Sequence, residues 1–235
     1  MSTFAEVRAE LQALANPADA EFLQRFFKTG PGEYGEGDRF LGIRVPALRR
    51  LVRAHGDLSV DDCGELLRTG AHEERLFALL ALVQRYARAD AAGKEAIHRL
   101  YLASTAQVNN WDLVDSSAES LVGAHLEGGE IDLLETLARS GMLWERRIAI
   151  VATFHFIKRG ELGPTLRIAE MLLGDAHDLI HKAVGWMLRE VGKRDQGAEE
   201  DFLRMHCGRM PRTMLRYAIE KFPDELRRRY LRGDA

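Results

Sequence analysis

A tryptophan and an aspartate stand four residues apart near the middle of this chain of 235 residues. Trp111 and Asp115 follow Asn109 and Asn110, either of which can cap the first turn of a helix. Residues four apart share one face of a helix, so this spacing places an indole beside a carboxylate. A carboxylate stabilises developing positive charge, and an indole ring attracts cations. A core tryptophan beside a structural aspartate is the alternative, and it is the more common use of such residues.

Two later segments carry further aromatic and basic residues. Lys182, Trp186 and Arg189 fall at helical positions i, i+4 and i+7, so they lie on one stripe. Arg147 stands among apolar residues in an earlier segment with helical spacing. A tryptophan flanked by cations suits a surface that meets an anionic partner such as a nucleic acid. A half-buried packing role for Trp186 remains open as the alternative.

Helices must position these residues, because apolar side chains recur at helical spacing along nearly the whole chain. Alternating Val, Ile and Thr runs, which are typical of strands, are absent from the sequence. Helix pairs recur every ~35–45 residues, which is the spacing of HEAT-like arrays. We therefore predict an all-α fold, a curved solenoid of HEAT-like helix pairs. The predicted helices are 3–15, 18–28, 46–54, 60–69, 72–87, 91–102, 112–126, 130–139, 142–159, 164–172, 179–191, 199–207, 211–219 and 224–232.

The sequence predicts a single α-helical domain over residues 1–235, interrupted by one loop. Residues 29–39 contain four glycines and a proline, which cannot sustain a helix, so this segment is predicted to be a flexible Gly-rich loop. A weaker alternative is that the loop closes over a bound partner and that Tyr34 touches it. A repeat fold with both ends capped favours a monomer.

The composition is that of an ordinary globular protein, with 46% hydrophobic and 29% charged residues. No stretch approaches the ~20 uninterrupted apolar residues of a membrane span, and no secretory signal pattern opens the chain. The two cysteines, Cys63 and Cys207, stand far apart, which argues against a zinc site and fits a reducing cytosol. The eight histidines are scattered, so we predict neither a metal nor a cofactor.

The formal net charge of −3 conceals an uneven distribution of charge. Residues 147–235 hold 17 Lys and Arg against 13 Asp and Glu, whereas residues 1–146 hold 16 against 23. The basic C-terminal part is compatible with a polyanionic partner. A solvated helix face explains such a run about as often.

Several motifs in register resemble one known family. The sequences NWDLVDS at 110–116, WERRIAI at 144–150 and KAVGWMLRE at 182–190 are similar to those of the bacterial DNA alkylation repair family, the AlkD-like alkylpurine DNA glycosylases. The GEGD sequence at 35–38, followed by FLGIRVP at 40–46, also resembles that family's N-terminal pattern. The likeness extends from about residue 21 to residue 230. The family's curved stack of HEAT-like helix pairs agrees with the fold that the periodicity predicts.

The resemblance implies removal of cationic N3- or N7-alkylated purines from double-stranded DNA in the bacterial cytosol, without a cofactor. It implies that Asp115 is the catalytic carboxylate and that Trp111 and Trp186 bind the lesion. The residues that would contact the DNA backbone are Arg147, Lys182 and Arg189. The chain departs from some relatives at Asn110, where they have a second tryptophan, and we expect this to alter packing or lesion range more than the chemistry.

Two other functions remain open from the sequence. One is a non-catalytic helical-repeat DNA-binding protein, which would bind DNA with or without the Asp115 carboxylate and release no base. The other is a HEAT-type protein-binding scaffold, in which Trp111 and Trp186 would be buried. Other enzyme classes find little support, because the sequence has neither a P-loop nor a Gly-rich dinucleotide-binding motif.

Overall fold

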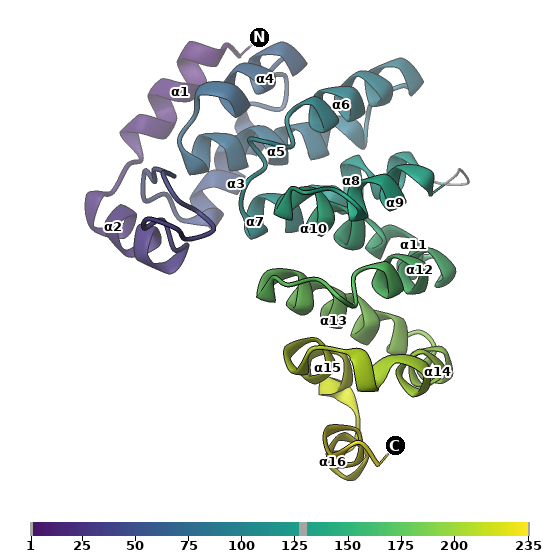
Figure 1. The fold of residues 1–235 in the computed structure, drawn as a ribbon. Coiled ribbons are helices and arrows are strands. Elements are labelled where there is room, and N and C mark those ends of the chain that lie inside the picture. Colours follow the sequence, from purple (N-terminus) through teal and green to yellow (C-terminus); the bar gives the residue numbers. More distant parts are fainter. Residues whose placement is uncertain (1, 127–130, 235) are drawn as a thin grey trace. The chain divides into compact units, whose positions relative to one another are not determined.

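The structure, a computed structural model, describes residues 2–126 and 131–234 (Figure 1). Within these ranges every regular element is a helix, which confirms the predicted all-α class. The chain divides into two compact units, Met1–Ser117 and Ala118–Ala235. The single domain over 1–235 stays a prediction. No helix among the described residues is long and apolar enough to cross a membrane.

The first unit is built of helices that pack in pairs. α3 lies against α5, α1 lies against α4, and α5 also contacts α4, α6 and α7. In this arrangement α4 and α5 form a closely packed pair, and α5 is the helix that α3, α4, α6 and α7 share as a neighbour. The helices of this unit are α1 Phe4–Ala13, α2 Pro17–Phe26, α3 Val45–Ala54, α4 Val60–Thr69, α5 His72–Tyr86, α6 Ala91–Ala103 and α7 Trp111–Asp115.

Helix α5 is the central helix of the first unit. Its side chains are buried without a break from His72 to Leu82. The helices α3, α4 and α6, which contact it, carry buried apolar residues that include Leu48, Leu66, Ile97 and Tyr101. A helix that is buried on all sides fixes the elements that pack against it. The short helix α7 is one of those elements.

The second unit repeats the paired arrangement. α13 lies between α10 and α15 and contacts both, while α12 contacts α9, α10 and α13 (Figure 1). α10, α13 and α15 therefore form one layer of the unit. The helices are α8 Ala118–Leu121, α9 Asp132–Ala138, α10 Leu143–Ala152, α11 Phe154–Lys158, α12 Gly163–Met171, α13 Asp178–Gly192, α14 Gln196–His206, α15 Arg212–Ala218 and α16 Asp224–Arg232, with 3-10 turns η1 Gly123–His125, η2 Cys207–Arg209 and η3 Ile219–Lys221.

Gly185 sets the close approach of α13 and α15. A Cβ atom at this position would lie 2.4 Å from the carbonyl oxygen of Met214 and 2.5 Å from Cβ of Tyr217. Arg189, one turn further along α13, pairs with Glu220, one turn beyond Tyr217. The two helices therefore run side by side in the same direction. This close contact aligns the partly exposed stripe of α13 with α15.

Two helices predicted as continuous are interrupted. The segment 112–126 breaks after α7, where the Ser117 hydroxyl donates to the carbonyl of Leu113 at 2.6 Å. The segment 142–159 breaks between α10 and α11, where the Thr153 hydroxyl donates to the carbonyl of Ile150 at 2.6 Å. Hydroxyl groups that bond backbone carbonyls within the preceding turn compete with the helical ladder. The predicted start of the helix 130–139 lies outside the described residues, and α9 begins at Asp132.

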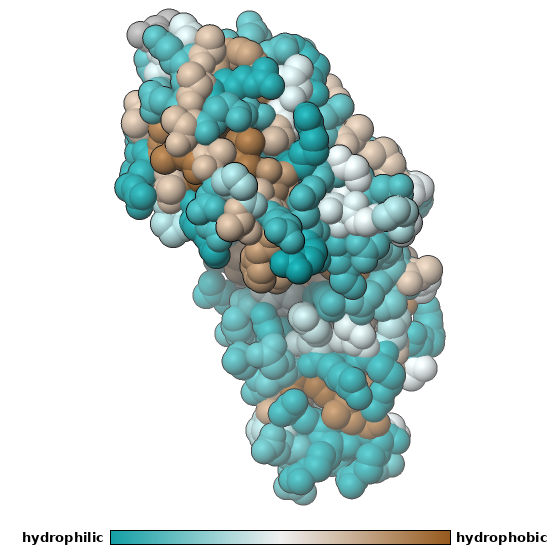
Figure 2. Space-filling model, turned by 90° about the vertical axis from the view of Figure 1, so that its left-hand side faces the viewer, coloured by the Kyte–Doolittle hydropathy of each residue, from teal (hydrophilic) through white to brown (hydrophobic). Residues whose placement is uncertain are grey.

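The surface carries few large apolar side chains. On the face drawn in Figure 2, hydrophilic residues cover most of the area and hydrophobic residues gather in smaller patches. Two of the most exposed apolar residues, Phe22 and Phe26, lie one turn apart on α2 and stack with ring centroids 6.1 Å apart. Single exposed apolar residues are ordinary, but two stacked phenylalanines mark α2 as an element with an accessible aromatic face.

Candidate functional site

The candidate site begins at the cap of α7. Asn110 is fully buried, and its side-chain oxygen accepts a hydrogen bond from the Trp111 amide at 2.9 Å, which confirms the predicted cap. A Cβ atom on Gly35 would lie 3.5 Å from the Asn110 side-chain nitrogen and 2.7 Å from the carbonyl oxygen of Phe27. This crowding leaves no room for an indole at position 110 unless the segment around Gly35 moves.

Trp111 is half-buried, as is Phe40, in an aromatic cluster made of Phe26, Phe27, Phe40 and Trp111. Its ring stacks on Phe27 with centroids 5.2 Å apart and meets Phe26 edge-on at 6.2 Å. Phe27 also stacks on Phe40 at 5.1 Å and is buried, whereas Phe26 is 54% exposed. The cluster therefore holds the indole from one side and leaves part of it accessible.

A buried histidine supports α7 from the interior of the unit. Nδ1 of His72 lies 2.9 Å from Asp38, and Nε2 lies 2.8 Å from Asp112 in the first turn of α7. The imidazole stacks on Phe40 with centroids 4.3 Å apart. Burial alone would lower the pKa of His72, but the hydrogen bonds and charges of Asp112 and Asp38 raise it to about 9. His72 is thus an imidazolium at neutral pH and donates to both carboxylates.

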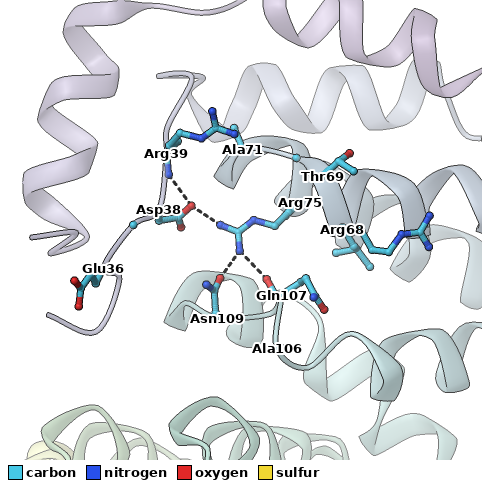
Figure 3. Close-up of a pocket in the computed structure, with 13 residues that line it drawn as sticks. Glu36, Asp38, Arg39, Arg68, Thr69, Ala71, Arg75, Ala106, Gln107 and Asn109 are labelled. Carbon is cyan, nitrogen blue, oxygen red and sulfur yellow. Dashed lines mark hydrogen bonds and ion pairs between the residues drawn. The ribbon is translucent and has the colours of Figure 1, made fainter. Parts of the chain in front are cut away.

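Arg75 ties the same carboxylate to the segment that precedes α7 (Figure 3). Its guanidinium donates to Asp38, to the carbonyl oxygen of Gln107 at 2.8 Å and to the side chain of Asn109, beside a cavity of about 280 Å³. Burial would raise the pKa of Asp38, but the His72 hydrogen bond and the Arg75 charge hold it below its usual value. The last residues of the loop 29–39 are anchored in this way, and the flexibility of the loop as a whole stays a prediction.

Asp115 is half-buried on α7, one turn beyond Trp111. Burial raises the pKa of the Tyr101 hydroxyl, and the negative charge of Asp115 raises it further. Asp115 is therefore close enough to the core to act on a buried side chain. The Tyr101 hydroxyl lies 3.1 Å from the Ser117 hydroxyl, within hydrogen-bond distance. Asp115 therefore stands at the edge of the core and is not enclosed in it.

The second unit carries the other predicted residues on α13 and α10. Lys182, Trp186 and Arg189 lie on one partly exposed stripe of α13, whose opposite side is buried. Lys182 pairs with Asp178 at 2.6 Å, and Arg189 pairs with Glu220. The stripe therefore exists as the sequence predicts, with its cations held by neighbouring carboxylates.

Trp186 has a fixed environment on this stripe. Its Nε1 donates to Oε1 of Glu190 at 3.2 Å, and its ring meets Phe154 of α11 with centroids 5.9 Å apart at an angle of 55°. Glu190 lies one turn further along α13. The indole is therefore held at its edge by a carboxylate and at its ring by an aromatic neighbour.

Arg147 is buried in α10, with only 5% of its surface exposed. Its Nη1 donates to the carbonyl oxygen of Leu179 at 2.5 Å, which ties α10 to the first turn of α13. This hydrogen bond thus joins two helices of one layer. Its contact with DNA stays a prediction.

The predicted residues fall into two groups, each within one unit. Trp111 and Asp115 share a face of α7 in the first unit, and Arg147 and the α13 stripe belong to one layer of the second. Among the described residues no group of three or more His, Cys, Asp or Glu side chains could hold a metal ion. Sequence reasoning missed the residues that support these groups, which are Asp38, His72, Arg75, Asp112 and Glu190. For His72 and Arg75 the sequence signal was the ionisable run 72–75 at the start of an apolar helix, whereas the spacing gave no sign that Asp38, Asp112 or Glu190 had a supporting role.

Comparisons with known proteins agree with this description. A family model described as DNA alkylation repair enzyme matches residues 7–222. A solved structure described as a predicted DNA alkylation repair enzyme from Enterococcus faecalis matches with a TM-score of 0.67 at 16% sequence identity, over 89% of this chain and 97% of that chain. At this identity the structural match shows a shared fold. No curated protein matches the chain at a significant level.

Proposed function

The chain belongs to the DNA alkylation repair enzyme family, and we propose that it is a DNA glycosylase that releases cationic N3- or N7-alkylated purines from double-stranded DNA. The observation that carries this proposal is the pairing of Trp111 and Asp115 on one face of α7. Membership of a DNA repair family makes DNA the partner. The base-releasing activity and the lesion class are the proposed parts.

Cleavage of the glycosidic bond of such a lesion needs less catalytic assistance from the protein than cleavage at an uncharged base. Alkylation at N3 or N7 gives the purine a positive charge, so the base is already a good leaving group and no strong general acid is required. Positive charge develops on the deoxyribose as the glycosidic bond lengthens. A fixed carboxylate nearby stabilises that charge, and Asp115 would also orient or deprotonate the attacking water.

The indole rings supply the second contribution. Trp111 and Trp186 are half-buried, so each ring has both a fixed orientation and an accessible part. A cation held against an indole gains roughly 0.5–2 kcal/mol. Lys182 and Arg189 would contact phosphates, which gives affinity that depends on salt and little on sequence. Arg147, which is 5% exposed, would add its positive charge beneath this surface.

The decisive experiment is base release from methylated duplex DNA by the wild type and Asp115→Asn side by side. We expect the variant to bind undamaged duplex within about twofold of wild type and to release 7-methylguanine on the order of 10²–10³-fold more slowly. Asp132→Asn, which removes an exposed carboxylate on α9, is the matched control and should be unaffected. Equal rates for wild type and Asp115→Asn would overturn the proposed role of Asp115.

The same assay separates the two alternative functions. A wild-type protein that binds duplex DNA and releases no alkylated base would be a non-catalytic DNA-binding protein. One that binds no duplex at all would be a scaffold for another class of partner.

A further inference from the structure

Three side chains lie around the Glu190 carboxylate: Trp186 and Arg189 of α13, and Lys193 directly after that helix. Oε1 of Glu190 accepts from Nε1 of Trp186 at 3.2 Å and from Nζ of Lys193 at 2.6 Å, and it lies 3.7 Å from Nη2 of Arg189. The Glu190 side chain is only 12% exposed, whereas that of Lys193 is 46% exposed. The carboxylate is therefore held close to the indole, in a place where water screens it weakly.

Two consequences follow for the indole. The hydrogen bond at Nε1 fixes the edge of the ring, and Phe154 limits its tilt from the other side. An anion that accepts from the indole N–H at the ring edge also polarises the ring, which makes its face more negative. Both effects favour a cation placed against the ring, since cation–π attraction depends on geometry and on the negative face.

We propose that Glu190 is a positioning residue that holds the Trp186 indole in place and strengthens its attraction for the cationic base or sugar. This inference rests on the proposed glycosylase function. In it, Glu190 acts through Trp186 and does not touch the substrate. Lys193 belongs to the Glu190 ion pair alone and has no part in binding the lesion.

A double-mutant cycle tests whether Glu190 acts through Trp186. Glu190→Leu removes the acceptor and the charge, and Trp186→Phe removes the N–H donor while keeping a ring. We expect Glu190→Leu to slow single-turnover release of 7-methylguanine about 3- to 30-fold, the range of one cation–π attraction. In the Trp186→Phe background the same change should have less than a twofold effect, because coupled residues are not additive.

Two further variants separate charge from packing. Glu190→Gln keeps an oxygen acceptor and loses the charge, so its release rate should fall between those of wild type and Glu190→Leu. Lys193→Met removes a cation that pairs with Glu190 from the position directly after α13 and should change release by less than twofold. Equal losses from Glu190→Leu in the wild-type and Trp186→Phe backgrounds would overturn the inference.

Readouts that need no base release keep this inference distinct from the proposed function. In ¹⁵N NMR spectra, the indole N–H signal of Trp186 is assigned as the one lost in Trp186→Phe. The chemical shift of this signal should change in Glu190→Leu, while the signals of Trp111 and Trp144 should not. An unmoved Trp186 signal would contradict the positioning role even if the enzyme were active.

Duplexes with an abasic-site analogue test the cation preference directly. Wild type should bind a duplex carrying a cationic pyrrolidine sugar more tightly than one carrying neutral tetrahydrofuran, and Glu190→Leu should reduce that ratio about 3- to 30-fold. A wild type that releases no base yet shows this ratio would fail as a glycosylase and still support the role of Glu190. A ratio unchanged by Glu190→Leu would count against the electrostatic part of the inference.

Discussion

At the scale of single residues, the most consequential feature is a buried positive charge between two negative ones. The His72 side chain is 2% exposed and contacts Asp38 and Asp112. Its pKa of about 9 lies above the ordinary 6.5 because the two carboxylates outweigh the effect of burial. A group whose pKa is raised on folding stabilises the fold fully below the unfolded pKa, and the contribution is lost as pH rises through the folded value.

His72→Gln should therefore destabilise the protein in a pH-dependent way. We expect a loss of about 2–4 kcal/mol at pH 6, where the imidazolium contributes fully, and a smaller difference from wild type at pH 10. Urea unfolding at a series of pH values measures both quantities. His177→Gln is the control, because burial lowers the pKa of His177 and its neutral form is already present throughout the alkaline range. A loss for His72→Gln that is the same at pH 6 and pH 10 would contradict a charged His72.

At the scale of elements, the sequence predicted where helices lie better than where they end. Apolar spacing located α4, α5, α13 and α16 to within a few residues. It joined α10 to α11, because periodicity continues through Thr153 and nothing in that pattern reveals a hydroxyl bonded to the Ile150 carbonyl. The stripe of α13 followed from spacing alone, but the contact between Glu190 and Trp186 depends on rotamers that a sequence pattern does not contain.

The run of ionisable residues at the start of α5 is the clearest failure of sequence reasoning. Such a run is usually solvated, yet Glu73 is 2% exposed and accepts hydrogen bonds from the amides of Leu41, Gly42 and Ile43. Its partners lie about 30 residues earlier in the chain. Only the packed fold brings them together, so local composition gave no sign of them.

The contact between α13 and α15 makes a prediction at this scale. Gly185→Ala should lower stability by about 1–3 kcal/mol, because the added methyl group overlaps Met214 and Tyr217 and must push the two helices apart. Thermal or urea unfolding measures the change. Gly163→Ala at the start of α12 is the matched control, since a Cβ there meets no atom within 4 Å, and it should be neutral or slightly stabilising. Equal effects of the two changes on stability would mean that α13 and α15 can move apart without loss of stability.

At the scale of the whole molecule, the net charge of −3 says little about DNA binding, because local pairing decides which cations are available. Lys182 and Arg189 are paired with carboxylates. Arg212 and Arg216 are exposed four residues apart on α15, and neither has a carboxylate partner among the described residues. These two arginines lie on the helix that packs directly against α13.

Salt dependence tests this distribution of charge. Removing one interaction between a cation and a phosphate makes the slope of log K against log salt shallower by about 0.9, so Arg212→Ala with Arg216→Ala should reduce it by about 2 for an undamaged duplex. Arg228→Ala with Arg229→Ala on α16 removes the same charge and should leave the slope nearly unchanged. Equal reductions in both double variants would show that net charge, and not the position of the arginines on α15, governs binding.

The buried ionisable start of α5 also limits how this chain can be altered. All four side chains from His72 to Arg75 hold partners elsewhere in the unit: His72 and Arg75 both bind Asp38, and Glu74 binds the amide of Ala71 as well as Arg8 of α1. A helix turns by about 100° per residue. One residue inserted between Ala71 and His72 would therefore rotate or shift all four side chains away from their partners. Tags, reporter insertions and new chain ends are therefore better placed elsewhere, for example at the exposed surface around Gly160, while the junction between residues 70 and 76 has to keep its length.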